Sequence, residues 1–276
     1  MKKLFGMITC AALIAGAASA QELKGWKLAW QEEFNYTGLP DTSKWGYEVG
    51  HIRNQEQQYY TRARPENVRV ENGNLVIRGL KETYPNAAYR PGSERWNEAD
   101  SIAHYTSASI NTLNKYAVKY GRIEVRAKLP AGAGIWPAIW MMGINRSHVG
   151  WPHCGEIDIM EFIGKEPQNI HGTIHYAKGN GHASSGSKIS SDALHKGYHI
   201  YAIEWDEEKI DIYFDSTRYH RFTLDVADNA NGNAFRKPFY LLLNLALGGG
   251  WPGPVDGNAL PQEFLVDYVR VYEAVK

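Results

Sequence analysis

The chain has 276 residues, with thirty basic and thirty acidic side chains, so its formal net charge is zero. This balance gives no support for a polyanionic partner, and no nucleic acid is expected to bind. Nine tryptophans and seventeen tyrosines make the chain rich in aromatic residues. Aromatic rings stack on the flat apolar faces of sugars, but they also fill β cores, so composition leaves both uses open.

The first twenty residues have the pattern of an export signal. Two lysines precede an apolar run, and a small-residue cleavage site ends at Ala20. We therefore predict a signal peptide over 1–20 and an exported protein that is secreted, periplasmic or on the cell surface. A lipid anchor on Cys10 is the less favoured alternative, because most of the apolar run follows that residue. No later stretch is long enough to cross a membrane, so stable membrane insertion is not expected.

Cleavage at that point would leave Cys154 as the only cysteine. An exported chain with one thiol has no internal disulfide and must depend on its core for stability. No catalytic-cysteine pattern surrounds Cys154, so it is predicted to be a small buried hydrophobic residue.

Strand patterns run along the whole of 21–276, and helical periodicity is almost missing. Strands are predicted at 26–34, at 67–77 as a hairpin about Asn72-Gly73, and at 105–112, 120–129, 135–142, 154–164, 170–177, 198–205, 209–215, 217–224, 238–247 and 263–272. A long polar loop is predicted at 81–104, and the only short-helix or loop segment at 226–236. So many short strands, with no repeat or composition shift, predict a single all-β domain, and a two-sheet jelly roll is favoured.

The apolar run 154–164 carries three acidic residues, Glu156, Asp158 and Glu161. On a regular strand the first two share a face and Glu161 points to the other. One extra residue, a bulge around Ile159–Met160, would return Glu161 to the same face. Two outer carboxylates that flank a bond are the usual equipment for glycosidic cleavage, and a middle one can tune them. The alternative is a surface strand whose acids face solvent.

Aromatic and imidazole side chains surround this run in the sequence. Trp136 and Trp140 are four apart and share a strand face; Trp136 is predicted to be a sugar platform, whereas sugar binding and core filling both stay open for Trp140. Pro137 cannot donate to a ladder, so this segment is expected at a sheet edge or bulge. His171 and His175 would be roughly 13 Å apart on a strand, which excludes a shared zinc ion. His175 is either a hydrogen-bonding group in the cleft or a satisfied core histidine.

Polar residues also precede the tyrosine pair at 59–60. Asn54, Glu56 and Gln58 offer donors and acceptors that suit sugar hydroxyls, or they are solvated loop residues.

Taken together, these segments resemble glycoside hydrolase family 16, and specifically its laminarinase-like endo-β-1,3(4)-glucanases. The resemblance covers nearly the whole mature chain, and its order and number of motifs make it specific. The segments that carry it are 54–61, 105–110, 120–130, 134–140, 155–161, 172–175, 243–253 and 267–272.

The resemblance implies a concanavalin-like β-jelly-roll sandwich with a concave substrate cleft. It also implies endo-hydrolysis of β-1,3-glucan or mixed-linkage β-1,3-1,4-glucan with retention of configuration. By motif match, Glu156 would be the nucleophile, Glu161 the general acid/base and Asp158 the assisting carboxylate, and the extra residue Met160 matches the bulged branch. The positions that would line the sugar-binding cleft are those of Asn54, Trp136, Trp140 and His175.

Catalysis is expected to need no cofactor, but relatives often hold a structural calcium ion far from the cleft. Its ligands would map to Asp267 and to backbone oxygens near Glu33 and Gly73, and oxygen-only ligands suit calcium. The chain departs from many relatives at Ser109, where they carry a basic residue. The loop 81–104 could reshape one end of the cleft.

The expected partner is a polysaccharide, and the protein is expected to be a monomer. Two other functions on the same fold stay open. One is a glucan-binding protein without catalytic activity, because fold does not fix function. The other is a transglycosylase, which passes the glycosyl group to a second sugar instead of water.

Overall fold

The computed structural model describes residues 23–179, 181–230 and 232–275. The predicted signal peptide, 1–20, and Cys10 lie outside the described residues. Within the described ranges no helix combines the length and the apolar character that crossing a membrane requires.

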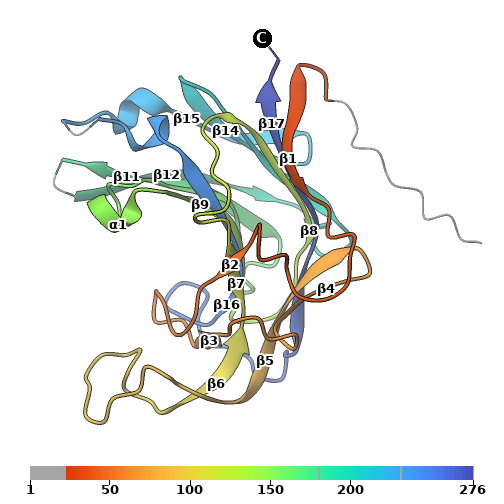
Figure 1. Ribbon diagram of the computed structural model, residues 1–276, viewed down its shortest axis with the longest axis vertical. Helices are drawn as coiled ribbons and strands as arrows, with labels where there is room; N and C mark the ends of the chain where they lie inside the picture. Colours follow the sequence, from red (N-terminus) through yellow and green to blue (C-terminus); the bar gives the residue numbers. More distant parts are fainter. Residues whose placement is uncertain (1–22, 180, 231, 276) are drawn as a thin grey trace, which may run out of the picture.

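The described strands form two antiparallel sheets, apart from one parallel pair, that pack face to face (Figure 1). The larger sheet has ten strands and the smaller has seven. The larger contains β1 (Trp26–Glu32), β3 (Gln58–Tyr60), β4 (Val68–Glu71), β5 (Asn74–Pro85), β6 (Ile102–Ser107), β8 (Gly121–Lys128), β13 (His199–Trp205), β14 (Lys209–Phe214), β15 (Thr217–Thr223) and β17 (Gln262–Ala274). The predicted all-β, two-sheet sandwich is confirmed.

The smaller sheet has the strand order β12-β11-β10-β9-β16-β7-β2. Its strands are β2 (Gly46–Tyr47), β7 (Ser109–Asn111), β9 (Ile135–Gly143), β10 (Glu156–Phe162), β11 (Asn169–Lys178), β12 (Gly181–Ser190) and β16 (Phe239–Leu247). Three short helices, α1 (Arg146–Val149), η1 (Leu224–Ala227) and η2 (Ala234–Arg236), complete the described elements. The strand that carries the three acids, β10, is thus interior to this sheet.

The core lies between the two sheets and is built from alternate residues of each strand. Val125 of β8 and Phe264 of β17 meet Ile139 of β9 and Leu243 of β16, and each is fully buried. A second, smaller apolar cluster lies on the outer face of the seven-stranded sheet and contains Ala138, Trp140, Met142, Cys154, Tyr240 and Leu242. Cys154 is a free, buried thiol, as predicted.

Several predicted element boundaries were right and others were wrong. The Asn72-Gly73 turn joins β4 to β5 with positive φ at both residues, 52° and 73°, as a type I′ turn requires. The segment 105–112 is two strands in different sheets, because the chain crosses between layers at Ala108 without a turn residue. The predicted loop 81–104 is shorter, since β5 continues to Pro85 and β6 begins at Ile102. Strand β12, which has no apolar alternation, was missed, as were β2, β3 and α1.

The segment around Pro137 does not lie at a sheet edge, because β9 lies between β10 and β16. The pairing of β9 with β10 ends at Ala138. The carbonyl of Ile135 faces the β10 side, where it accepts a hydrogen bond from the Gly164 nitrogen at 2.9 Å. In a strand, backbone groups two residues apart face the same neighbouring strand, so the nitrogen of Pro137 also faces the β10 side. Its missing N–H costs no ladder hydrogen bond there, because the pairing with β10 ends at Ala138.

Gly164 follows β10 and crosses close to the loop that precedes β9. A Cβ built there would lie 1.6 Å from the backbone oxygen of Gly132. We expect Gly164→Ala to lower the free energy of unfolding by about 1–3 kcal/mol, because two backbones must move apart. Urea unfolding followed by tryptophan fluorescence measures this loss. Gly197→Ala is the matched control, since a Cβ there meets nothing within 4 Å; equal losses in both variants would contradict the close approach.

Candidate active site

Strand β10 contains a bulge at the predicted place. Between Asp158 and Met160 it advances two residues while β9 advances one, and its pairing with β11 shifts between Asp158 and Glu161. Ile159 and Met160 therefore both face the core, and Glu161 returns to the face of Glu156. The predicted bulge is confirmed, and the three acids share one side of the sheet.

A cavity of about 290 Å³ lies over that side of the sheet. It is lined by most of the residues predicted for the site, namely Asn54, Trp136, Trp140, Glu156, Asp158 and Glu161. Glu56, one of the polar residues noted before the tyrosine pair, also lines it. Lining residues that sequence reasoning missed are Arg53, Ala138, Met142, Arg146, Trp151, Asn244 and Ala246. The acids therefore line a common hollow and are not spread over a solvated strand face.

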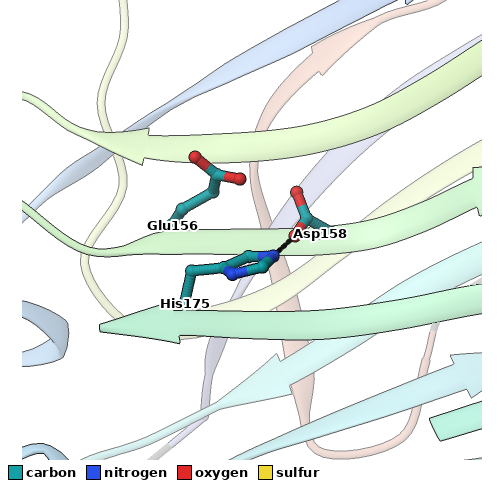
Figure 2. A group of neighbouring side chains, drawn as sticks. All are labelled: Glu156, Asp158 and His175. Atoms are coloured by element: carbon teal, nitrogen blue, oxygen red, sulfur yellow. Dashed lines mark ion pairs between the residues drawn. The ribbon is translucent and has the colours of Figure 1, made fainter. Parts of the chain in front are cut away.

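His175 lies beside the acids, although it is not among the cavity-lining residues. It is paired in register with Glu156 across β10 and β11, and Figure 2 shows its ring turned toward Asp158. Its Nε2 is 3.2 Å from Oδ2 of Asp158, a charge contact only, since this buried oxygen has no hydrogen-bond partner. Its Nδ1 is 2.8 Å from Nε2 of His182 on β12. The alternative of a satisfied core histidine is thus excluded, because the His175 side chain is only half-buried and lies beside the acids.

Among the residues that the structure describes, Glu156, Asp158 and His175 form a group that could hold a metal ion. One side-chain atom each from Glu156, Asp158 and His175 lie within 4.8 Å of one another. The predicted calcium ligands lie elsewhere. There, Asp267 Oδ2 is 2.5 Å from a guanidinium nitrogen of Arg126, and the Glu33 carboxylate binds the guanidinium of Arg270 through both oxygens. Calcium at Asp267, Glu33 and Gly73 stays a prediction.

Burial raises the proton affinity of all three acids, to different degrees. Burial holds the pKa of Glu161 well above its usual range, and the nearby Asp158 and Glu156 carboxylates raise it further. Burial also raises the pKa of Asp158 well above its usual range, with a contribution from Glu156. The pKa of Glu156 is raised by burial, but His175 and Arg53 oppose that rise. The site thus favours the protonated form more strongly at Glu161 than at Glu156.

The two predicted tryptophans have different environments. Trp136 is half-buried, and its indole nitrogen donates to Oε1 of Glu161 at 3.1 Å. Its ring meets Trp251 edge-on at 5.4 Å. Trp140 is only 6% exposed, donates to Oδ1 of Asn244 at 2.7 Å and has the Arg53 guanidinium 4.9 Å from its ring centre. Trp140 therefore packs in the outer apolar cluster and also lines the cavity, and sugar binding by its ring stays a prediction.

Asn54 belongs to a strained polar segment at one side of the cavity. Asn54 and Gln55 have left-handed φ values of 56° and 52°, a conformation that non-glycine residues seldom adopt. The Asn54 side chain donates to Glu56 at 3.1 Å, and Glu56 accepts a second bond from Gln58 at 2.7 Å. Glu56 is 3% exposed, so it is not a solvated loop residue. Its carboxylate holds the amide of Asn54 in place through the hydrogen bond between them.

Ser109, the predicted point of departure from the family pattern, is fully buried. Its hydroxyl donates to Glu48 at 2.6 Å, and Glu48 forms an ion pair with Arg53. Arg53 and Arg146 thus supply positive charge to the cavity, and Ser109 contributes to the position of Arg53 through Glu48.

Trp151 was missed although it precedes the acidic run by only five residues. Its side chain lies close enough to Glu156 to oppose the rise in the pKa of that carboxyl, and its ring centre lies 4.6 Å from that of His182. The Trp151-Pro152 pair directly before the acidic strand was the signal that could have marked it. Arg146, on the four-residue helix α1, had no comparable signal.

Cleavage of a glycosidic bond uses a pair of carboxylates, and this cavity offers three beside tryptophan rings that can hold a sugar. The class of protein is a glycoside hydrolase. The sequence profile described as "Glycosyl hydrolases family 16" matches residues 55–270. The chain belongs to that family, and the predicted resemblance is confirmed.

Similar proteins include enzymes named for more than one substrate. The beta-glucanase of Rhodothermus marinus is 41% identical, over 98% of this chain and 92% of that protein. The X-ray structure of the laminarinase from Rhodothermus marinus has a TM-score of 0.79 and 42% identity, and the match covers 91% of this chain and 98% of that one. A structure described under endo-acting O-glycanases that human gut bacteria express to initiate mucin breakdown has a TM-score of 0.85 and 41% identity, with 91% of each chain covered.

Proposed function

We propose that this family 16 enzyme is an exported, endo-acting hydrolase of β-1,3-glucan or mixed-linkage β-1,3-1,4-glucan that retains anomeric configuration. The observation that carries the proposal is the bulge, which brings Glu156, Asp158 and Glu161 to one cavity. The Rhodothermus marinus beta-glucanase and laminarinase support the substrate class. Chains of β-linked glucose carry apolar ring faces and hydroxyls, which match the indoles and amides of the cavity.

The proposed reaction is a double displacement. Glu161 gives its proton to the glycosidic oxygen while the Glu156 carboxylate attacks the anomeric carbon. The bond to the leaving sugar breaks, and an ester bond joins Glu156 to the remaining chain. Glu161, now ionised, takes a proton from water, which attacks the same carbon and releases Glu156. Two inversions give a product with the original configuration.

The electrostatics of the cavity support these roles. A general acid must hold its proton at the working pH, and burial with two neighbouring acids raises the pKa of Glu161 well above its usual range. A nucleophile must be ionised, and His175 and Arg53 favour the charged form of Glu156. Asp158 lies between the two on the same strand and contacts His175. We assign it the role of holding that imidazole next to Glu156.

A second candidate substrate is a mucin O-glycan. The specific observation in its favour is the TM-score of 0.85 with the O-glycanase structure, against 0.79 with the laminarinase. The same two-step chemistry would serve either substrate, because the acids act on the glycosidic bond and not on the identity of the sugar. The difference would lie in the residues that contact the outer sugar units.

Side-by-side digestion tests the substrate class. The protein is incubated with laminarin, mixed-linkage glucan, cellulose and mucin O-glycans, and new reducing ends and product sizes are measured. We expect a series of short oligosaccharides from the first two, whose early products are β-anomers by NMR. Cleavage of mucin glycans alone would establish the second candidate. Binding of laminarin without new reducing ends would identify a glucan-binding protein, and products longer than the substrate would identify a transglycosylase.

A further inference from the structure

An extension of the β5–β6 hairpin reaches beyond the sandwich. Strand β5 continues past a register shift between Lys81 and Tyr84, and its last residue pairs with Ile102. The connecting segment, 86–101, projects from the body of the molecule and curls to the side on which α1 lies (Figure 1). Because Arg146 of α1 lines the cavity, the extension lies on the side of the molecule that carries the active site.

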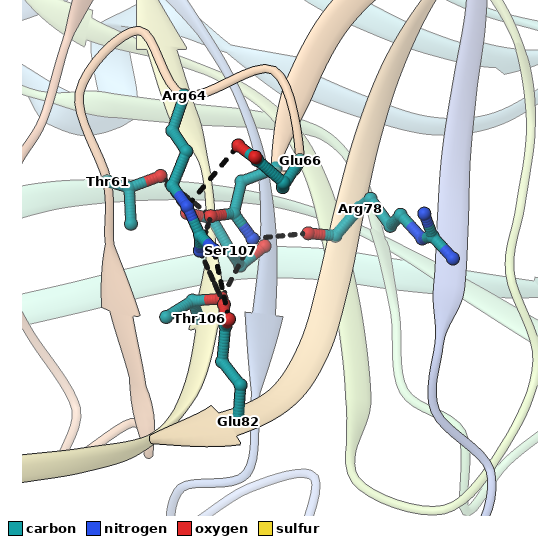
Figure 3. A network of polar contacts seen from close by, with 8 residues as sticks. Thr61, Arg64, Glu66, Arg78, Glu82, Thr106 and Ser107 are labelled. Carbon is teal, nitrogen blue, oxygen red and sulfur yellow. Dashed lines mark hydrogen bonds and ion pairs between the residues drawn. The ribbon is translucent and has the colours of Figure 1, made fainter. Parts of the chain in front are cut away.

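The base of this extension is fixed by a polar network. Arg64 binds both carboxylate oxygens of Glu82, at 2.5 Å and 2.9 Å, and Thr106 of β6 also donates to Glu82. Asn67 donates to the hydroxyl of Thr106 at 2.9 Å. Figure 3 shows Arg64, Glu82 and Thr106 converging from three segments of the chain. A bidentate arginine–carboxylate pair has a defined geometry, so the hairpin leaves the sheet in a set direction.

The segment 86–101 is also ordered internally. Asn86 is 6% exposed and donates to the backbone oxygens of Asn97 and Asp100 at 3.1 Å and 2.8 Å. Glu98 is 7% exposed and accepts bonds from Ser93 and Arg95 at 2.9 Å and 3.0 Å. A segment closed by its own side chains loses little conformational entropy when a ligand binds to it.

This ordered segment presents Trp96 to solvent, with 38% of the residue exposed. The Trp96 and His51 rings are T-shaped to one another, with their centres 5.9 Å apart. The His51 ring is packed in the same way against Tyr59, with 5.6 Å between the ring centres. His51 precedes Arg53 and Asn54, which line the cavity, by two and three residues. Trp96 thus lies just outside the catalytic cavity, beyond the side occupied by Asn54.

We propose that Trp96 is an aromatic platform that binds one sugar unit of the substrate chain outside the catalytic cavity. A held, partly exposed indole offers the flat apolar surface on which a hexose ring stacks. The ligand is an uncharged β-linked glycan long enough to run from the acids past Asn54. This inference rests on the proposed function. It predicts a preference for long chains over short ones.

The test compares Trp96→Ala, Trp96→Tyr and the control Tyr89→Ala. Tyr89 lies in the same segment and is 40% exposed. Its backbone nitrogen, and not its side chain, donates a hydrogen bond to the backbone oxygen of Asn86. The substrates are β-1,3-glucan oligosaccharides of increasing length and laminarin. We expect Trp96→Ala to lower kcat/KM about tenfold on long substrates, through KM, and to leave the shortest cleaved oligosaccharide unchanged. Trp96→Tyr should restore most of the loss, and Tyr89→Ala should change nothing.

Three results would overturn the platform. They are an unchanged length dependence in Trp96→Ala, an equal loss at every length, and a matching loss in Tyr89→Ala. If the wild-type protein cleaves the glucans and Trp96→Ala cleaves them identically, this inference is refuted and the proposed function stays intact. A wild-type protein that cleaves no glucan would refute the proposed function first, and this inference with it.

Discussion

Glu156→Gln is expected to lower kcat on laminarin by at least about 10⁴-fold, because no other group can form the glycosyl-enzyme bond. The amide has the shape of the carboxylate but cannot attack the anomeric carbon. Burial already raises the pKa of Glu156, so removal of this charge should cost the fold little. Initial rates and a thermal melt of the same preparation measure both effects.

Chemical rescue is the sharper control for this assignment. Glu156→Ala leaves room for azide, which can attack the anomeric carbon in place of the carboxylate. With an activated aryl glycoside, azide should restore turnover and yield the α-azide, the inverted product. Substantial activity of Glu156→Gln without azide, or a β-azide product from Glu156→Ala, would show that a different residue is the nucleophile.

Glu161→Gln should lower kcat on glucan by about 10²–10⁴-fold, because the leaving oxygen is no longer protonated. An aryl glycoside whose leaving group needs no proton should form the glycosyl-enzyme at nearly the wild-type rate. Burst kinetics with that substrate separate the two steps. A burst rate with the aryl glycoside that falls as much as kcat falls on glucan would contradict the general-acid role.

The pH profile of the wild-type enzyme should be bell-shaped. Glu156 must be ionised, and its pKa is raised by burial, so activity should fall as pH decreases through that raised value. Glu161 must be protonated, and its pKa is held well above its usual range, so activity should fall as pH rises through that raised value. In Glu161→Gln the fall at high pH should disappear from the residual kcat/KM on glucan, because the group that loses its proton is gone. A fall that persists would assign it to another group.

The acid row could be predicted from sequence because its spacing conflicts with strand periodicity. Three acids in an apolar run need either solvent or a bulge, and the bulge was the only way to gather them on one face. The hairpin at Asn72-Gly73 was equally local, since both residues tolerate positive φ. Signals of this kind depend on neighbours in sequence.

The rest of the site depends on contacts between distant segments. Arg53 lies over Trp140 only because the chain before β3 folds across β9, and no pattern near Arg53 indicates this. His182 meets His175 through the register of β11 with β12. Strand β12 is made largely of glycine, serine and other small or polar residues at the sheet edge, so it has no apolar face to identify it.

The extra residue in β10 makes the active face tolerant of a change in chain length. An in-frame loss of the Met160 codon would leave Glu, Asp and Glu at alternate positions of a regular strand, still on one face. The cost would fall on the opposite side, where Met160 is fully buried and its loss would open a void among the hydrocarbon side chains. A lineage could therefore move between bulged and straight forms by a single-codon step, repaired by substitutions in the interior, without ever passing through an enzyme that lacks its acids.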